Sequence, residues 1–143
     1  MTVLGTSAFV GKLFGRVPEG AAWLDNDEDL EPRELASLRD EVTATLERHQ
    51  DNEDLARKAL RGFRRRELLR IALSSMVAVS DIERVGQALT DLSRAFLEGV
   101  LARARADADG IEFAMIAMGR LGGSELSFGS DLDVVYVFRD IGA

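Results

Sequence analysis

The stretch Phe113–Asp140, FAMIAMGRLGGSELSFGSDLDVVYVFRD, decides the fold of this chain. It begins with a continuous apolar run, 113–118, and ends with a second one, 134–138, which is richer in β-branched and aromatic residues. Apolar runs of this length are typical of strands that are covered on both faces. We therefore predict two buried strands, joined by a glycine turn and a short polar segment, with Asp131 and Asp133 opening the second strand.

Before this stretch, apolar residues recur at helical spacing, so residues 1–109 are predicted to form a helical region. Residues 110–143 are predicted to begin a second, incomplete domain, which makes the fold class α+β. Five helices are expected. The first three are 8–14 with a cap at Thr6 or Ser7, Pro18 to Trp23, and Pro32 to about His49. The fourth is capped by Asp51 or Asn52 and ends within 74–80, and the fifth is capped by Ser80 or Asp81 and ends within 106–110. The acidic segment 25–29 is predicted to be a loop.

Composition limits the classes of function. The 143 residues carry a net charge of −7, which argues against general nucleic-acid binding. No cysteine is present, no apolar run approaches the length of about 18 residues that spans a bilayer, and the N-terminus lacks the pattern of a signal peptide. We predict a cytoplasmic protein with no membrane or nucleic-acid partner.

The charge is unevenly distributed along the chain. Thirteen acidic residues and three arginines lie between Glu19 and Asp54, whereas seven basic residues and one acidic residue lie between Arg57 and Arg70. Such a basic stripe is either a phosphate or partner surface or, more often, a solvated helix face with acidic neighbours. Its members include Arg61, Arg64, Arg65, Arg66 and Arg70.

The two aspartates predict a metal site. Side chains alternate along a strand, so Asp131 and Asp133 would face the same way, roughly 6.6 Å apart along the backbone. Magnesium prefers oxygen ligands and usually takes one or two carboxylates together with substrate phosphates. Paired magnesium ions can hold the attacking and leaving oxygens of a phosphoryl displacement. Asp131 and Asp133 are therefore the predicted catalytic and magnesium-binding residues.

The glycines before them predict a phosphate site. Gly119, Gly122 and Gly123 have no Cβ atoms, so their amide groups can approach phosphate oxygens. Ser124 adds a hydroxyl and is expected to start a helix, and Arg120 can contact a phosphate directly. Neither the glycines nor the aspartates are specific alone, but in this order and spacing they favour ATP binding.

The combined motif carries a resemblance. Gly119, eleven residues, and then Asp131-x-Asp133 resemble the signature of the DNA polymerase β-like nucleotidyltransferase superfamily. The sequence MGRLGGSELSFGSDLDVVYVF at 118–138 resembles one family even more closely, the glutamate–ammonia ligase adenylyltransferases, also called glutamine synthetase adenylyltransferases. LGTSAFVGKLFGRVPE at 4–19 and FRRRELLRIA at 63–72 are similar to that family's helical lead-in, so the resemblance covers nearly the whole chain.

The resemblance implies an activity and partners. Members transfer AMP from ATP to a tyrosine of glutamine synthetase with magnesium, remove it by phosphorolysis in a second half, and respond to a PII-type signal protein. The sequence of this chain resembles the adenylylating half of these proteins more than the other half. Two alternatives stay open: a catalytically silent regulatory fragment that binds nucleotide, and a superfamily member with another acceptor.

The resemblance also implies residue roles. Asp131 and Asp133 would bind magnesium, and the motif residues would bind ATP: Gly119, Arg120, Gly122, Gly123, Ser124 and Ser130. Arg120 stands where many members have lysine. The superfamily also needs a third carboxylate from a later strand, and Asp140 does not match it. We therefore expect a fragment that is inactive alone.

Overall fold

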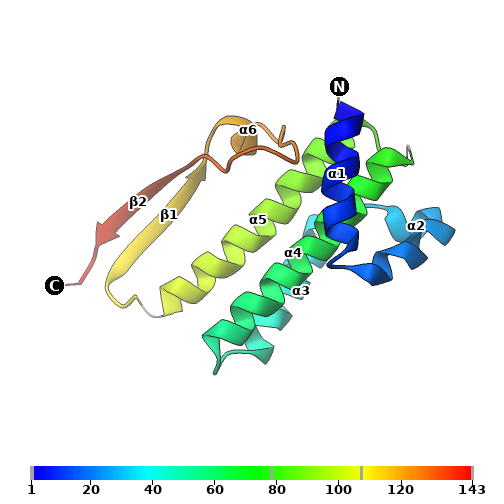
Figure 1. The fold of residues 1–143 in the computed structure, drawn as a ribbon. Helices are drawn as coiled ribbons and strands as arrows, with labels where there is room; N and C mark the ends of the chain where they lie inside the picture. The colour runs from blue at the N-terminus through cyan, green and yellow to red at the C-terminus, as the bar shows by residue number, and fades with distance from the viewer. Residues whose placement is uncertain (1, 78, 107, 143) are drawn as a thin grey trace.

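The structure, a computed structural model, describes residues 2–77, 79–106 and 108–142, with residues 2–7 described by their backbone alone. Helices occupy the N-terminal part of the chain, and a two-stranded antiparallel hairpin follows them (Figure 1). The predicted α+β class is therefore confirmed. No helix in the described ranges is long and apolar enough to cross a membrane.

Three short elements form the N-terminal part: α1 (Thr2–Phe14), the 3₁₀ helix η1 (Pro18–Asp25) and α2 (Asp27–Leu30). The predicted cap of the first helix is wrong, because α1 starts at Thr2 and so passes through residues 6 and 7. The loop predicted at 25–29 is also partly wrong. The side chain of Asn26 accepts a hydrogen bond from the Glu28 N–H at 3.2 Å, and this cap starts the single turn of α2.

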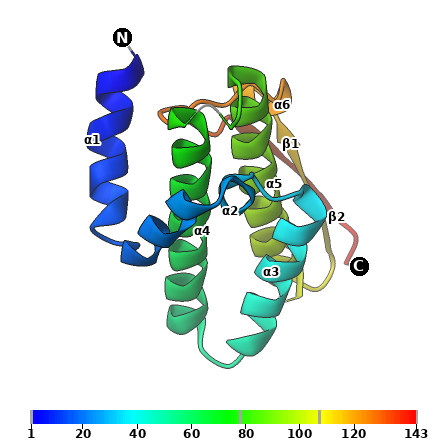
Figure 2. The ribbon, with the colours of Figure 1, turned by 90° about the vertical axis from the view of Figure 1, so that its right-hand side faces the viewer.

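Three long helices lie side by side and form the body of the molecule (Figure 2): α3 (Leu35–Arg48), α4 (Glu53–Met76) and α5 (Ile82–Ala106). Their apolar stripes meet in one core, whose most buried members include Val42, Leu69 and Leu92. Burial of each such side chain stabilises the fold by roughly 1.5–3 kcal/mol. α1 packs on α4, so the N-terminus joins the same core.

The ends of these helices follow local signals in the sequence. The side chain of Asn52 accepts a hydrogen bond from the Leu55 N–H at 3.0 Å, and that of Asp81 accepts one from the Arg84 N–H at 2.8 Å. Both caps were predicted, as were the ends of α4 and α5. α3 begins at Leu35 rather than at Pro32, because the backbone of Glu34 is still extended.

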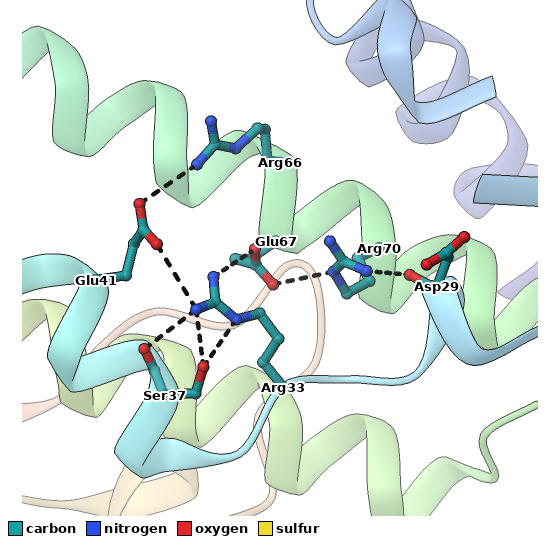
Figure 3. A network of polar contacts seen from close by, with 7 residues as sticks. All are labelled: Asp29, Arg33, Ser37, Glu41, Arg66, Glu67 and Arg70. Carbon is teal, nitrogen blue, oxygen red and sulfur yellow. Dashed lines mark hydrogen bonds and ion pairs between the residues drawn. The ribbon is translucent and has the colours of Figure 1, made fainter. Parts of the chain in front are cut away.

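A buried carboxylate fastens the segment before α3 to α4 (Figure 3). Glu67 is 3% exposed and accepts hydrogen bonds from Arg33 at 3.4 Å and from Arg70 at 3.2 Å. Arg70 also donates to the carbonyl of Asp29, and Arg33 to the hydroxyl of Ser37 at 2.8 Å. The two arginines neutralise the buried charge, so this network links α2, α3 and α4.

The hairpin consists of β1 (Ile111–Ala117) and β2 (Val134–Asp140), paired antiparallel from Ile111↔Asp140 to Ala117↔Val134. The prediction that both strands are buried is wrong: Tyr136 is 58% exposed and Phe138 is 73% exposed. The two strands pair only with each other within the described residues, and a two-stranded sheet cannot cover its own faces. The boundary predicted between residues 109 and 110 falls between α5 and β1, and stays a prediction.

Candidate functional site

The hairpin brings the glycine turn and the aspartates together. After β1 come the single helical turn α6 (Gly119–Gly122) and a loop that leads to β2. The Met118 N–H donates to the Asp133 carbonyl at 2.8 Å, which extends the strand pairing by one residue beyond Ala117↔Val134. β2 itself begins at Val134, so the two aspartates precede the strand instead of opening it, which corrects the prediction.

The Asp133 carboxylate lies close to Gly119 at this end of the hairpin. The φ angle of Gly119 is +51°, and a Cβ atom built on it would lie 2.8 Å from Oδ2 of Asp133. Only glycine adopts this backbone conformation readily and also leaves room for the carboxylate. A glycine at position 119 therefore allows the Asp133 carboxylate to lie against the start of α6.

The backbone N–H groups of Gly122 and Gly123 form hydrogen bonds within the turn. The Gly122 N–H donates to the Met118 carbonyl at 2.9 Å, and the Gly123 N–H donates to the Gly119 carbonyl at 3.0 Å. These two amides were predicted to cradle phosphates, but in the structure they hold the turn closed. The amides of the first turn of α6 are the ones that a helix cannot satisfy internally.

Gly122 instead permits a close approach of the turn to β1. A Cβ atom on it would lie 2.7 Å from the carbonyl oxygen of Ala117, which belongs to the backbone and cannot move aside cheaply. Gly122 therefore fixes where α6 lies relative to the end of the strand.

The helix expected to start at Ser124 does not form. Ser124 has a φ of +59°, and the helical turn lies five residues earlier, at α6. The Glu125 N–H donates to the Arg120 carbonyl at 2.9 Å and so belongs to the turn. α5 supports this loop closely, because a Cβ atom on Gly86 would lie 3.4 Å from the Ser124 carbonyl. Sequence reasoning missed this support, since Gly86 carries no local signal for it.

Arg120 of α6 and Ser130 of the loop lie close together. The guanidinium of Arg120 donates to the hydroxyl of Ser130 at 3.5 Å, and that hydroxyl also accepts a hydrogen bond from the Ser127 N–H at 2.9 Å. The side chain of Arg120 is exposed. The hydrogen bond therefore holds a positive charge beside Ser130, the residue that directly precedes Asp131.

The donor set at this site fits magnesium bound to a nucleotide. Asp131 and Asp133 are both exposed, so their carboxylates can reach a solvent-borne ligand. Within the described residues, no three histidine, cysteine or acidic side chains gather into a metal site. Two carboxylates match the number that magnesium usually takes when phosphates supply its remaining ligands.

The hairpin and the glycine turn border a hollow against α5. This hollow has a volume of about 360 Å³ and is lined in part by Met115, Ala117 and Val134. Gly122 and Ser124 of the candidate site also line the hollow, so α5 borders the site on this side.

An ion-pair cluster at the hollow was not predicted. Glu98 accepts hydrogen bonds from Arg39 at 2.6 and 2.8 Å and from Arg94 at 3.0 Å. The hydrogen bonds from Arg39 hold the pKa of Glu98 below its usual value, and Arg94 adds to the effect. The i, i+4 spacing of Arg94 and Glu98 is visible in the sequence, but the contact with Arg39 of α3 needs the fold.

The chain is similar in sequence to known proteins along almost its whole length. The sequence model of the glutamate–ammonia ligase adenylyltransferase family matches residues 1–142. The chain belongs to this family. It is 49% identical over 99% of its length to the bifunctional glutamine synthetase adenylyltransferase/adenylyl-removing enzyme of Leifsonia xyli subsp. xyli. Proteins with the same name from Cutibacterium acnes and Mycobacterium marinum are each 40% identical over 96% of the chain.

These relatives are much longer than the chain. The match covers 14% of the Leifsonia and Cutibacterium proteins and 15% of the Mycobacterium protein. Both the helical region and the hairpin lie inside the matched segment, so membership of this adenylyltransferase family rests on the whole chain as well as on the motif.

Proposed function

We propose that this chain forms part of a magnesium-dependent enzyme that transfers AMP from ATP to a tyrosine of glutamine synthetase. The observation that carries the proposal is the close approach of the Asp133 carboxylate to Gly119, inside the segment that matches the adenylyltransferase family. It joins the two halves of the motif, which are separated by more than ten residues in the sequence.

Each residue of the site has a proposed role. Asp131 and Asp133 hold magnesium, and magnesium, when bound, neutralises charge on the phosphates and stabilises the leaving pyrophosphate. Arg120 contacts a phosphate, and its bond to Ser130 limits where the guanidinium can lie. Gly119 keeps the Asp133 carboxylate against the start of α6. Gly122, Gly123 and Ser124 shape the turn next to the phosphates.

The partners follow from the names of the relatives. Glutamine synthetase is the acceptor in those names, and "bifunctional" with "adenylyl-removing" supports a second activity, which we propose is phosphorolysis. Regulation by a PII-type protein, assignment to the adenylylating half and a cytoplasmic location are further proposals from the family resemblance. The lack of cysteine fits a reducing compartment.

We expect the 143 residues to be inactive alone. In the described residues no third histidine, cysteine or acidic side chain joins the two carboxylates to form a metal site. Measurable AMP transfer to glutamine synthetase by the isolated chain would contradict this expectation.

The decisive experiment uses the full-length protein that carries this segment. It is mixed with glutamine synthetase, magnesium and ATP labelled in the α-phosphate, and incorporated label is followed with time. Asp131→Asn and Asp133→Asn should each lower the rate at least a hundredfold, whereas Asp140→Asn at the other end of β2 should not. If both site variants keep the wild-type rate, the metal assignment is wrong.

The same reaction separates the alternatives. Mass spectrometry of the labelled glutamine synthetase should locate AMP on a tyrosine. Nucleotide binding without transfer would favour the silent regulatory fragment, and label on a different protein in a cell extract would favour another acceptor.

A further inference from the structure

α4 distributes its basic residues unequally between its faces. Arg66 pairs with Glu41 at 3.9 Å, and Arg70 pairs with the buried Glu67 at 3.2 Å. In the described part of the chain, no carboxylate forms an ion pair with Lys58 or Arg61. The predicted basic stripe therefore divides into a neutralised half that stabilises the fold and a half that faces solvent.

The solvent-facing half lines a shallow hollow on the first four turns of α4. Its basic members are Arg57, Lys58, Arg61 and Arg65, and Asp54 lies at its edge. Lys58 and Arg61 are exposed, whereas Arg57 pairs with Glu53 at 2.6 Å. A net charge of −7 makes this concentration of free positive charge unusual for the molecule. Such a patch attracts and orients an acidic partner.

An apolar groove adjoins this basic patch on the next face of α4. The groove has a volume of about 350 Å³ and runs between the ends of α3, α4 and α5. Arg57 borders both the groove and the patch, so the two form one continuous surface. Besides Arg57, the groove is lined by Leu46, Glu53, Ala56, Leu60, Val100, Arg103 and Ala104, and Glu53 is paired with Arg57. Val100 is 44% exposed, so the apolar floor is open to solvent.

We propose that this surface, defined by the groove and the basic patch, docks an acidic protein segment that also carries apolar side chains. The apolar side chains would occupy the groove, and the carboxylates would face Lys58 and Arg61. This occupant accounts for both halves of the surface, because a purely acidic ligand would leave the groove empty. The inference does not depend on the proposed AMP transfer.

A nucleic acid fits the surface less well. Single-stranded nucleic acids bind where aromatic rings stack on bases along a basic groove, and among the described residues no aromatic side chain lines either hollow. A long phosphate backbone would also run past the acidic start of α4, at Glu53 and Asp54. A protein segment can place its carboxylates only where the cations are.

The test uses a fluorescein-labelled peptide of three repeats of Leu-Glu-Glu-Ala-Leu-Glu-Glu and the 143-residue chain, followed by fluorescence anisotropy. The double variant Lys58→Glu/Arg61→Glu should weaken binding about tenfold, since each exposed ion pair contributes about 0.2–1 kcal/mol and reversal adds repulsion. The matched control is Lys12→Glu/Arg16→Glu, which changes the net charge equally at two other exposed positions and should weaken binding less than about twofold.

A second pair of variants tests the groove and keeps every basic residue. Val100→Glu should weaken peptide binding at least fivefold, whereas Ile82→Glu, at an 87% exposed apolar position on the same helix, should not. Thermal unfolding of each variant checks that the fold is kept. Three results would each overturn the proposal: equal weakening by the two double variants, equal binding of a peptide with lysine in place of glutamate, and tighter binding of a 20-nucleotide oligouridine.

Discussion

Replacement of Gly119 by alanine tests whether this glycine acts through Asp133. An alanine at a φ of +51° costs about 1–2 kcal/mol of conformational energy, and the lower entropy of the unfolded chain offsets part of it. The new Cβ atom would lie 2.8 Å from Oδ2 of Asp133, whereas ordinary contacts begin at 3.4 Å. The carboxylate must therefore move by at least half an ångström, and it can do so cheaply because it is exposed.

The structure thus predicts a small effect on stability and a large one on catalysis. We expect a net destabilisation of about 1 kcal/mol, which lowers Tm by about 4 °C in a chain of this size. A displacement on the scale of 1 Å lowers the rate of an enzyme by as much as a hundredfold, so AMP transfer by the full-length protein should fall by about 10- to 100-fold. Gly129→Ala is the matched control, because no atom of the described residues lies within 4 Å of its Cβ position.

A double variant identifies the route of the effect. If Gly119→Ala acts by displacing Asp133, the double variant Gly119→Ala/Asp133→Asn should be no slower than Asp133→Asn alone, because the carboxylate is already absent. Rates that multiply in the double variant would refute this reasoning. An unchanged Tm for Gly119→Ala would separately refute the argument from backbone conformation.

Three further predictions concern stability. Glu67→Ala should lower the free energy of unfolding, measured in urea, by about 3 kcal/mol, because it leaves two arginines without their buried partner; a loss below about 1 kcal/mol would show that the network is dispensable. Gly62→Ala should raise the free energy of unfolding by about 0.5 kcal/mol, because the part of the chain that the structure describes places no atom within 4 Å of the new Cβ atom, and a loss would contradict this. The pKa of Glu98 is lower in the folded chain than in the unfolded chain. The stabilisation by Arg39 is therefore fully present at pH values above the unfolded-state pKa, and it is lost as the pH falls through the folded-state pKa. The advantage of wild type over Glu98→Gln should therefore shrink between pH 7 and pH 3, and since Glu98 is 41% exposed it should stay below about 1 kcal/mol; an advantage that grows at low pH would refute the assignment.

The local signals of the sequence determined where the main elements lie. The caps Asn52 and Asp81 fix the starts of α4 and α5, since each satisfies a backbone N–H only a few residues away. The change from helical periodicity to continuous apolar runs placed both strands to within a few residues. Such signals need no distant partner, so the helical region, the two strands and the glycine–aspartate motif were predictable from the chain alone.

Tertiary structure decided how the parts of the site meet. Antiparallel pairing brings Met118 opposite Asp133, and only this register puts the carboxylate against Gly119. In the folded chain the Gly122 N–H donates a hydrogen bond to the Met118 carbonyl within the turn, whereas the sequence predicted that it would bind a phosphate. It also left the strands exposed, because burial depends on which elements cover a face and not on the apolar run itself. Residue types and spacing determine which groups are available, but contacts across many residues depend on long-range pairing, which local preferences do not specify.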